Sequence, residues 1–169
     1  MLIGIMSDSH GDAAETARAV ALLKSRGATK LVHCGDICDL TVLDELAGHD
    51  AVFVWGNCDH LDGSLLRYVD AIGLPRPTVP VTFDVGPRRI AVFHGHERGF
   101  SSAVKSGRFD IIFYGHSHEY ADHRENGCRL INPGALHRAR IHTVAMLDLS
   151  SDELTFLDVH DGSTVRHRK

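Results

Sequence analysis

The sequence predicts an α/β fold in which two β-sheets pack together with helices on the outside, in one domain spanning residues 1–169. Two observations lead to this class. Apolar strand-like segments alternate with helix-like segments in the first half, a pattern typical of parallel strands joined by right-handed crossovers. After Pro75-Arg76-Pro77 the pattern changes to closely spaced strands, so we expect a second sheet to begin there. A length of 169 residues suits a single domain.

Three strand and helix pairs are expected in the first half of the chain. Residues 2–6 are an apolar run, which indicates a buried strand, and residues 13–25 have the spacing of an amphipathic helix. The same alternation recurs twice, with strands expected at 30–33 and 51–55 and helices at 41–47 and 64–72.

The second half is expected to consist mainly of strands. Two strand-like segments flank Gly86-Pro87, which predicts a hairpin. The expected elements, in order, are strands at 79–85 and 89–93, a short helix at 101–106, and strands at 110–114, 120–125, 129–131, 143–149 and 154–160.

Composition and charge exclude several classes of protein. The hydrophobic fraction of 43% and the charged fraction of 24% are ordinary for a globular domain, and no apolar run approaches the ~20 residues of a membrane span. A net charge of -4 gives no general attraction to nucleic acid. The first residues lack the features of a secretory signal, so we expect a cytoplasmic protein whose four cysteines are thiols.

Polar residues suited to chemistry follow the expected strands. Ligands collect outside the carboxyl ends of strands in α/β sheets, so these loops are expected to meet. In the first loop Asp8 and His10 are two residues apart and can point to the same side, offering oxygen and nitrogen donors to a divalent ion. The alternative is that Asp8 or Asp12 only caps the following helix.

The second loop contains Cys34-Gly35-Asp36-Ile37-Cys38. Gly35 allows a sharp turn that presents Asp36, a carboxylate able to bridge two ions. Two cysteines without a second pair do not match a zinc thiolate site, so Cys34 and Cys38 are interpreted as small buried apolar residues.

Three further loops add donors. Gly56-Asn57-Cys58-Asp59 offers the Asn57 amide oxygen, although asparagine is also common in turns. The pairs His94-Gly95-His96 and His116-Ser117-His118 each follow a strand, and two such pairs are hard to explain as packing. The segment 132–135, Asn-Pro-Gly-Ala, is interpreted as a structural turn.

Taken in order, the motifs Asp-x-His, Gly-Asp-x-x-Asp, Gly-Asn-x-Asp, His-Gly-His and Gly-His-x-His resemble those of the calcineurin-like metallophosphoesterases. With the small size, Gly-Asn-Cys-Asp and Asn-Pro-Gly-Ala, the chain is most similar to the YfcE-like phosphodiesterases. The resemblance implies a four-layer α/β sandwich and two divalent cations, with manganese the first expectation and iron, nickel or zinc as alternatives. It implies seven metal ligands: Asp8, His10 and His118 on one ion, Asn57, His94 and His116 on the other, and Asp36 between them.

The implied activity is hydrolysis of a small phosphate ester, most of all a diester, by a hydroxide that bridges the two ions. Asp36, Asn57, Cys58, Asp59 and His96 are the implied catalytic residues, the last two orienting ligands or contacting substrate. Cys58 stands where many members have a proton-donating histidine. A thiol is a weak donor, so alcohols that leave easily and diesters are expected substrates, with His60 a possible substitute donor.

The same residues also allow two other functions, a protein-interaction scaffold and a structural zinc site. A protein-interaction scaffold has the same fold in the retromer complex, but a scaffold has no reason to crowd seven donors together. A single structural zinc site is disfavoured because the donors are carboxylate, amide and imidazole rather than thiolate. A homo-oligomer, either a dimer or a tetramer, is expected from the resemblance. The sequence leaves the physiological substrate open.

Overall fold

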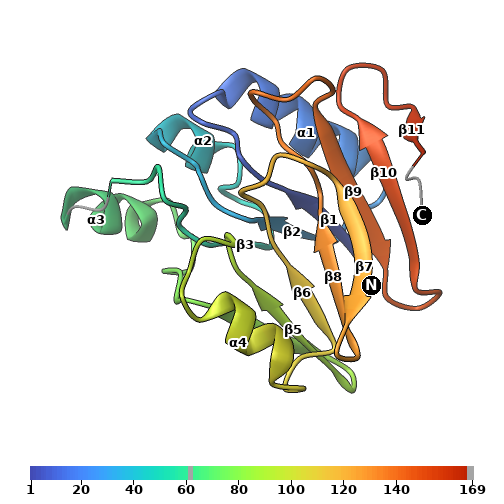
Figure 1. The fold of residues 1–169 in the computed structure, drawn as a ribbon. Coiled ribbons are helices and arrows are strands. Elements are labelled where there is room, and N and C mark those ends of the chain that lie inside the picture. Colours follow the sequence, from blue (N-terminus) through green and yellow to red (C-terminus); the bar gives the residue numbers. More distant parts are fainter. Residues whose placement is uncertain (61–62, 167–169) are drawn as a thin grey trace.

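The computed structural model describes residues 1–60 and 63–166, which form two β-sheets packed face to face with helices on both outer sides (Figure 1). This is the architecture that the sequence predicts. No helix among the described residues is long and apolar enough to cross a membrane.

The first sheet has six strands in the order β11-β10-β9-β1-β2-β3. The half ending at β3 is parallel, because β1 pairs with β2 and β2 with β3 in the same direction, as expected for crossover connections. The strand β9 pairs antiparallel with the other edge of β1. The strands are β1 (Leu2–Met6), β2 (Lys30–His33), β3 (Ala51–Phe53), β9 (Thr143–Asp148), β10 (Glu153–Asp158) and β11 (Thr164–Val165).

The second sheet has five strands in the order β4-β5-β6-β8-β7. The hairpin expected at Gly86-Pro87 joins β4 to β5, while β5, β6 and β8 run parallel and β7 pairs antiparallel with β8. The strands are β4 (Val81–Val85), β5 (Arg88–Val92), β6 (Ile111–Phe113), β7 (Ala121–Glu125) and β8 (Cys128–Asn132).

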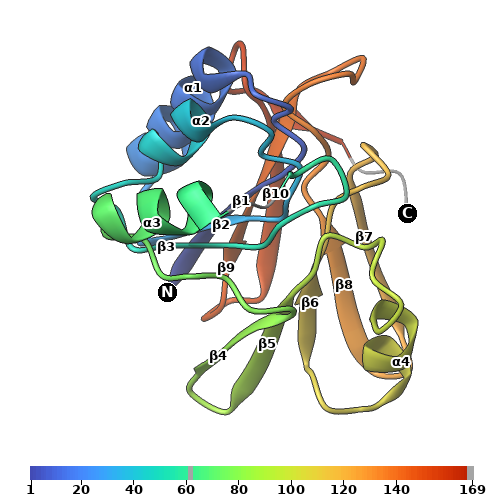
Figure 2. The same cartoon turned by 90° about the vertical axis from the view of Figure 1, so that its left-hand side faces the viewer.

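Four helices cover the outer faces of the sheets. Figure 2 shows α1, α2 and α3 on the free face of the first sheet and α4 on the free face of the second. They are α1 (Ala13–Ser25), α2 (Leu40–Asp44), α3 (Gly63–Ala71) and α4 (Phe100–Lys105). The helix α2 ends earlier than the expected 41–47, because Leu46 N–H bonds to Leu43 O in a tight turn.

Alternation along the strands builds three apolar layers. In β1, Ile3 and Ile5 point between the two sheets, whereas Met6 packs under the helices. In β5, Ile90 lies between the sheets and Ala91 packs under α4. The order of layers is therefore helices, sheet, sheet and helix. The carboxyl ends of parallel strands of both sheets meet along one edge, because His94 after β5 lies 2.7 Å from the carbonyl of Cys34 after β2.

Candidate metal centre

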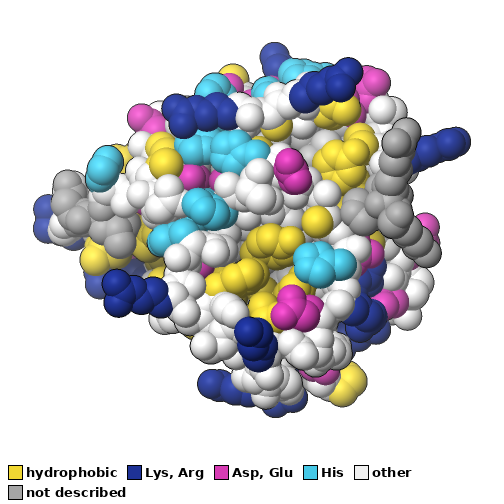
Figure 3. Space-filling model, in the orientation of Figure 1, with side chains coloured by type: hydrophobic (Ala, Val, Ile, Leu, Met, Phe, Trp, Pro, Cys, Tyr) yellow, Lys and Arg dark blue, Asp and Glu magenta, His cyan; other side chains and the backbone are white. Residues whose placement is uncertain are grey.

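Seven polar side chains from five loops meet where parallel strands of both sheets end. The loops are held together by backbone hydrogen bonds: Asp8 N–H donates to Gly35 O (3.0 Å) and Gly115 N–H donates to His94 O (2.9 Å). Asp8 and His10 follow β1, Asp36 follows β2, Asn57 follows β3, His94 follows β5, and His116 and His118 follow β6. Figure 3 shows histidine side chains gathered on the upper left of this face, with Lys and Arg side chains along its upper edge.

One half of the cluster consists of Asp8, His10, Asp36 and His118, whose donor atoms all lie within 4.8 Å of one another. His118 Nε2 lies 3.2 Å from Asp8 Oδ1 and 3.1 Å from His10 Nε2, and His10 Nε2 lies 3.7 Å from Asp36 Oδ2. Ligands bound to one ion at about 2.0 to 2.2 Å are separated by roughly 3 Å to 3.6 Å. The spacing of these atoms therefore fits a shared cation.

The other half lies around His94. Its Nε2 is 3.1 Å from Asn57 Oδ1 and 3.3 Å from Asp36 Oδ1, and its ring packs against His116 with centroids 5.1 Å apart. His94 Nδ1 lies 2.7 Å from the carbonyl oxygen of Cys34. A histidine that donates from Nδ1 to a carbonyl presents the Nε2 lone pair as a ligand. The two oxygens of Asp36 thus face different halves of the cluster.

The backbone of the cluster is strained. Five of the seven residues, Asp8, His10, Asp36, His116 and His118, have φ between 45° and 69°, in the left-handed region that few non-glycine residues adopt. Such conformations cost about 1 to 3 kcal/mol each and persist where the surroundings impose them. Each of these five residues lies in a loop that follows a strand, so the strain aims a donor side chain at the common centre.

Close packing of the loops requires glycine at two positions. A Cβ on Gly56 would lie 2.1 Å from Asp36 Oδ1, and a Cβ on Gly115 would lie 1.9 Å from Ser7 Oγ. Both glycines let the neighbouring loop approach the carboxylate of a donor residue. They explain why glycine precedes Asn57 and His116 in the motifs.

The carboxylates have opposite electrostatic environments. Among the described residues, Ser7 Oγ and Asp8 Oδ1 are buried atoms without a hydrogen-bond partner, and burial raises the pKa of Asp8. Burial also acts to raise the pKa of Asp36, but hydrogen bonds from His94 and the Cys58 N–H lower it below its usual range. An orphaned buried carboxylate oxygen is costly unless a cation neutralises it. The donor set and its charge therefore fit divalent metal ions.

Residues that the sequence analysis missed support these donors. Glu97 accepts backbone hydrogen bonds from His94 N–H (2.8 Å) and Gly95 N–H (2.7 Å). His33 is fully buried, and its pKa is lowered to about 3 by burial and by the nearby His94. The His33 ring is therefore neutral. Its Nδ1 accepts a hydrogen bond from Gly35 N–H, and its Nε2 lies 3.0 Å from Ser9 Oγ. Neither residue has a motif spacing that would have revealed it.

The capping alternative holds for Asp12 rather than Asp8. Asp12 caps α1, because its Oδ1 accepts a hydrogen bond from Glu15 N–H (2.9 Å).

Asn132 supports the interpretation of 132–135 as a structural turn. Its Nδ2 donates to Gly115 O (2.8 Å) and its Oδ1 accepts from Gly134 N–H (2.9 Å), so it fastens this turn to the loop that carries His116 and His118.

The prediction that Cys34 and Cys38 are both buried is wrong for Cys38. Cys34 lies in the core, but Cys38 is exposed at the rim of the cluster, with its Sγ 3.8 Å from His10 Nδ1. The loop turns outward because Cys38 itself has a φ of 64° and its N–H donates to Asp59 Oδ1 (2.6 Å).

Three predicted residues border the donors. Asp59 accepts hydrogen bonds from Cys38 N–H and from Gly56 N–H (2.7 Å), so it joins two of the site loops. The His96 ring lies 5.3 Å from His94, with a side chain that is 34% exposed. Cys58 is half-buried, and burial together with Asp36 and Asp59 raises the pKa of its thiol, which keeps it protonated at neutral pH.

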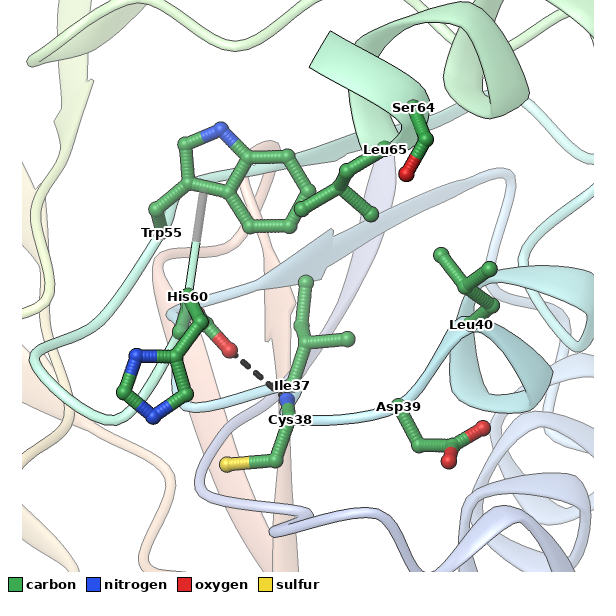
Figure 4. A pocket seen from close by; sticks show the side chains of 9 residues that line it. Ile37, Cys38, Asp39, Leu40, Trp55, His60, Ser64 and Leu65 are labelled. Carbon is green, nitrogen blue, oxygen red and sulfur yellow. Dashed lines mark hydrogen bonds between the residues drawn. The ribbon is translucent and has the colours of Figure 1, made fainter. Parts of the chain in front are cut away.

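His60 lines a separate small pocket of about 170 Å³ beside the Cys58 loop. Figure 4 shows the Trp55 ring and Leu65 on one wall of this pocket, with His60 and Cys38 lying nearer its other end. The pocket is therefore partly apolar and adjoins the loop that carries Asn57 and Cys58.

Comparisons with known proteins identify the family. The sequence profile of the calcineurin-like phosphoesterase superfamily domain matches residues 1–152. The chain belongs to this superfamily. As a calcineurin-like phosphoesterase it acts on phosphoesters through metal ions, so the predicted enzyme class, the dinuclear mechanism general to the superfamily and the two-sheet fold are confirmed.

Individual relatives agree over nearly the whole calcineurin-like domain. Phosphodiesterase MJ0936 of Methanocaldococcus jannaschii is 28% identical over 159 residues, covering 90% of this chain and 96% of the relative. Phosphodiesterase YfcE of Escherichia coli K12 is 26% identical over 183 residues, covering 98% and 96%. A solved structure of an archaeal phosphodiesterase superposes with a TM-score of 0.82 at 26% identity, covering 94% of this chain and 99% of that one.

Proposed function

We propose that this protein is a phosphodiesterase whose two divalent cations are held by Asp8, His10 and His118, by Asn57, His94 and His116, and by Asp36 between them. One observation carries the assignment. Asp36 Oδ2 lies 3.7 Å from His10 Nε2 and Asp36 Oδ1 lies 3.3 Å from His94 Nε2, so one carboxylate serves both donor sets. The similarity to relatives named phosphodiesterases supports the choice of a diester substrate.

The protein's own groups prepare the reaction. When bound, two cations neutralise charge on the phosphate and ease loss of a proton from water. Cys58 N–H donates to Asp36 Oδ1 (2.9 Å) and fixes the carboxylate that both donor sets share. Asp59 holds the loop carrying Asn57 in place. His96, exposed beside His94 and His116, is positioned to donate to a phosphate oxygen of the substrate.

The described part of the site has no strong proton donor for the leaving alcohol. The Cys58 thiol stays protonated, yet a thiol is a poor hydrogen-bond donor compared with an imidazolium. We therefore propose that diesters with alcohols that leave easily are hydrolysed faster than monoesters. His60 remains a second candidate donor, because it lines the pocket next to the Cys58 loop.

Several finer features belong to the same proposal. Mixed oxygen and nitrogen donors suit manganese, our first choice, and also iron, nickel or zinc. Residues 1–169 act as one domain, because β1 near the start of the chain and β11 at residues 164–165 belong to the same sheet. We expect a cytoplasmic enzyme that forms a dimer or tetramer, which light scattering can test.

Metal analysis together with a substrate panel tests the function. The purified protein is expected to hold two metal ions per chain and to hydrolyse bis(p-nitrophenyl) phosphate faster than p-nitrophenyl phosphate. Manganese, iron, nickel and zinc are each added back after chelation to identify the active ion. Two bound metals without hydrolysis of any monoester or diester would instead favour a protein-interaction scaffold.

A further inference from the structure

A second, larger groove opens directly beside the proposed metal ligands. Its volume is about 840 Å³, and its lining includes the proposed ligand His118 and Arg166, which lies next to the end of β11. Residues 138–141, which precede β9, also line it. The groove therefore extends the candidate active site rather than forming a separate cavity.

The groove is cationic in a protein of net negative charge. Arg138, Arg140 and Arg166 line it, against the single acidic side chain of Glu119. Within residues 1–60 and 63–166, none of these three arginines forms an ion pair with a carboxylate, and all three are exposed. By contrast, Arg129 on the neighbouring strand β8 is paired with Asp122 and Asp152. Arginines left without acidic partners are available to an anionic ligand.

Arg138 lies close to the metal centre. It follows His137, whose ring centroid is 6.0 Å from that of the proposed ligand His10. Arg138 lines the same groove as His118, Arg140 and Arg166.

Apolar surface accompanies the charge. The Tyr120 ring is half-buried, packs against Phe156 with centroids 5.2 Å apart, and forms part of the wall. Ile141, on the same wall, is 40% exposed. An aromatic ring and an aliphatic side chain beside arginines suit a ligand that combines a flat ring with anionic groups.

We infer that this groove binds the part of a phosphoester substrate beyond the scissile phosphate, and that this part carries a second phosphate group attached to a ring-bearing moiety, as in a nucleotide. The inference rests on the proposed function, because the proposed ligand His118 lines the groove, so a phosphate held at the metal centre would adjoin it. Guanidinium groups recognise phosphate through paired hydrogen bonds, which gives Arg140 and Arg166 their role.

A matched pair of substrates tests the inference. Thymidine 5′-(p-nitrophenyl phosphate) and its 3′-phosphorylated analogue share the scissile bond and leaving group and differ only in the second phosphate. The second phosphate is expected to lower KM about tenfold, consistent with one charge-assisted contact. Arg140→Ala and Arg166→Ala should each reduce this ratio towards one, and Arg140→Lys should restore part of it.

The control variant is Arg108→Ala, which removes an exposed arginine far from the groove lining, near Phe109. It should leave the KM ratio unchanged. Equal KM values for both compounds in the unmodified protein, or a ratio insensitive to Arg140 and Arg166, would overturn the inference.

A binding measurement separates this inference from the proposed function. Calorimetry with manganese present compares thymidine 3′,5′-bisphosphate with thymidine 5′-phosphate, and about tenfold tighter binding of the bisphosphate is expected. If neither ester were hydrolysed, the phosphodiesterase proposal would fail, while the affinity ratio and its loss in Arg140→Ala would still decide whether the groove takes a second phosphate. Equal affinities would contradict the groove assignment whatever the turnover.

Discussion

Two clusters of histidine and carboxylate lie at the same end of this molecule, and they are built in opposite ways. In the metal centre, Asp8 Oδ1 accepts no hydrogen bond from the described residues, although the ring of His118 lies 3.2 Å away, and donor residues have left-handed backbones. In the second cluster, Glu15 Oε1 lies 2.7 Å from His142 Nδ1 and 3.3 Å from His160 Nε2, while Arg18 donates to Oε2 (2.9 Å). None of its residues has a positive φ.

The difference shows that donor identity alone does not indicate a metal site. Both clusters place three or more possible ligands within 4.8 Å of one another. Only the first leaves a buried oxygen unsatisfied and holds its residues in strained conformations, and both costs are offset when a cation binds. In the second cluster both carboxylate oxygens of Glu15 are already occupied, so we expect a structural link between α1 and the loops flanking β9 and β10.

The substitution Asp36→Asn is expected to have the largest effect. Removing the charge shared by both donor sets should lower diesterase activity at least about 10³-fold and reduce the bound metal below two ions per chain. Steady-state kinetics and elemental analysis measure the two effects. Normal turnover with two metals retained would show that Asp36 does not bridge the sets.

Chelation should separate activity from folding. Removal of metal is expected to abolish turnover while circular dichroism at 222 nm, where helices dominate, changes little, because three apolar layers hold the fold together. Activity should return on adding manganese. Global unfolding in chelator would mean that the centre stabilises the fold as well as serving catalysis, and would weaken the contrast between the two clusters.

Replacing Cys58 by His tests the leaving-group step. General acid catalysis contributes about 10² to 10⁴ in rate, so Cys58→His should raise hydrolysis of monoesters and alkyl diesters at least about tenfold relative to nitrophenyl diesters. The ratio of the two rates is the observable. If Cys58 is instead only a packing thiol, Cys58→Ala and Cys58→Ser will change stability slightly and leave this ratio unchanged. An unchanged ratio in Cys58→His, with two metals bound, would point to His60 or to a step that needs no acid.

Glu15→Gln should affect stability but not catalysis. The side chain is 4% exposed, and loss of its charge-assisted hydrogen bonds should lower the free energy of unfolding by roughly 1–2 kcal/mol. Denaturant unfolding measures this change, and metal content and diesterase rate should match the unmodified protein. A drop in bound metal by one ion per chain would contradict the division drawn between the clusters.

The smallest effect is expected for Asp152→Asn, which should change how the free energy of unfolding depends on pH. Asp152 is paired with arginines and, among the described residues, has no histidine partner. Burial acts to raise the pKa of Asp152, but the hydrogen bond from Arg88 and the charges of Arg129 and Arg124 lower it overall. A lowered folded-state pKa contributes stability above the unfolded value of about 3.9, and this stability is lost as the pH falls through the folded pKa. Asp152→Asn should therefore be less stable than the unmodified protein at pH 7, with the difference shrinking below about pH 4.

Much of this arrangement could be predicted because local patterns determine it. The apolar run of β1 and the spacing of α1 are visible in the sequence, and the elements observed match those expectations at both ends. The donors could be anticipated as a group because each follows a strand. Their assignment to particular ions stays a prediction, since it came from a resemblance between motifs.

Other features depend on contacts that no local pattern records. The pairing of β9 with β1 joins residues more than a hundred positions apart, and the short β11 exists only because Phe156 and Leu157 offer it an edge. Cys38 reads as a small apolar residue, yet its exposure follows from a bond to Asp59 in another loop. Glu97 and His33 act through backbone groups and neighbouring hydroxyls, which sequence spacing does not specify.

The position of β1 between β2 and β9 has a consequence for how the protein is made. During synthesis β1, α1 and β2 leave the ribosome early, but β1 keeps one edge unpaired until Thr143–Asp148 emerges. The backbone bond from Leu136 N–H to Ser7 O, beside Asp8, likewise waits until residue 136 has emerged, shortly before β9. A nascent chain that stops before residue 136 therefore carries an open strand edge and an unfinished first donor loop, so the metal centre is completed among the last parts of the fold.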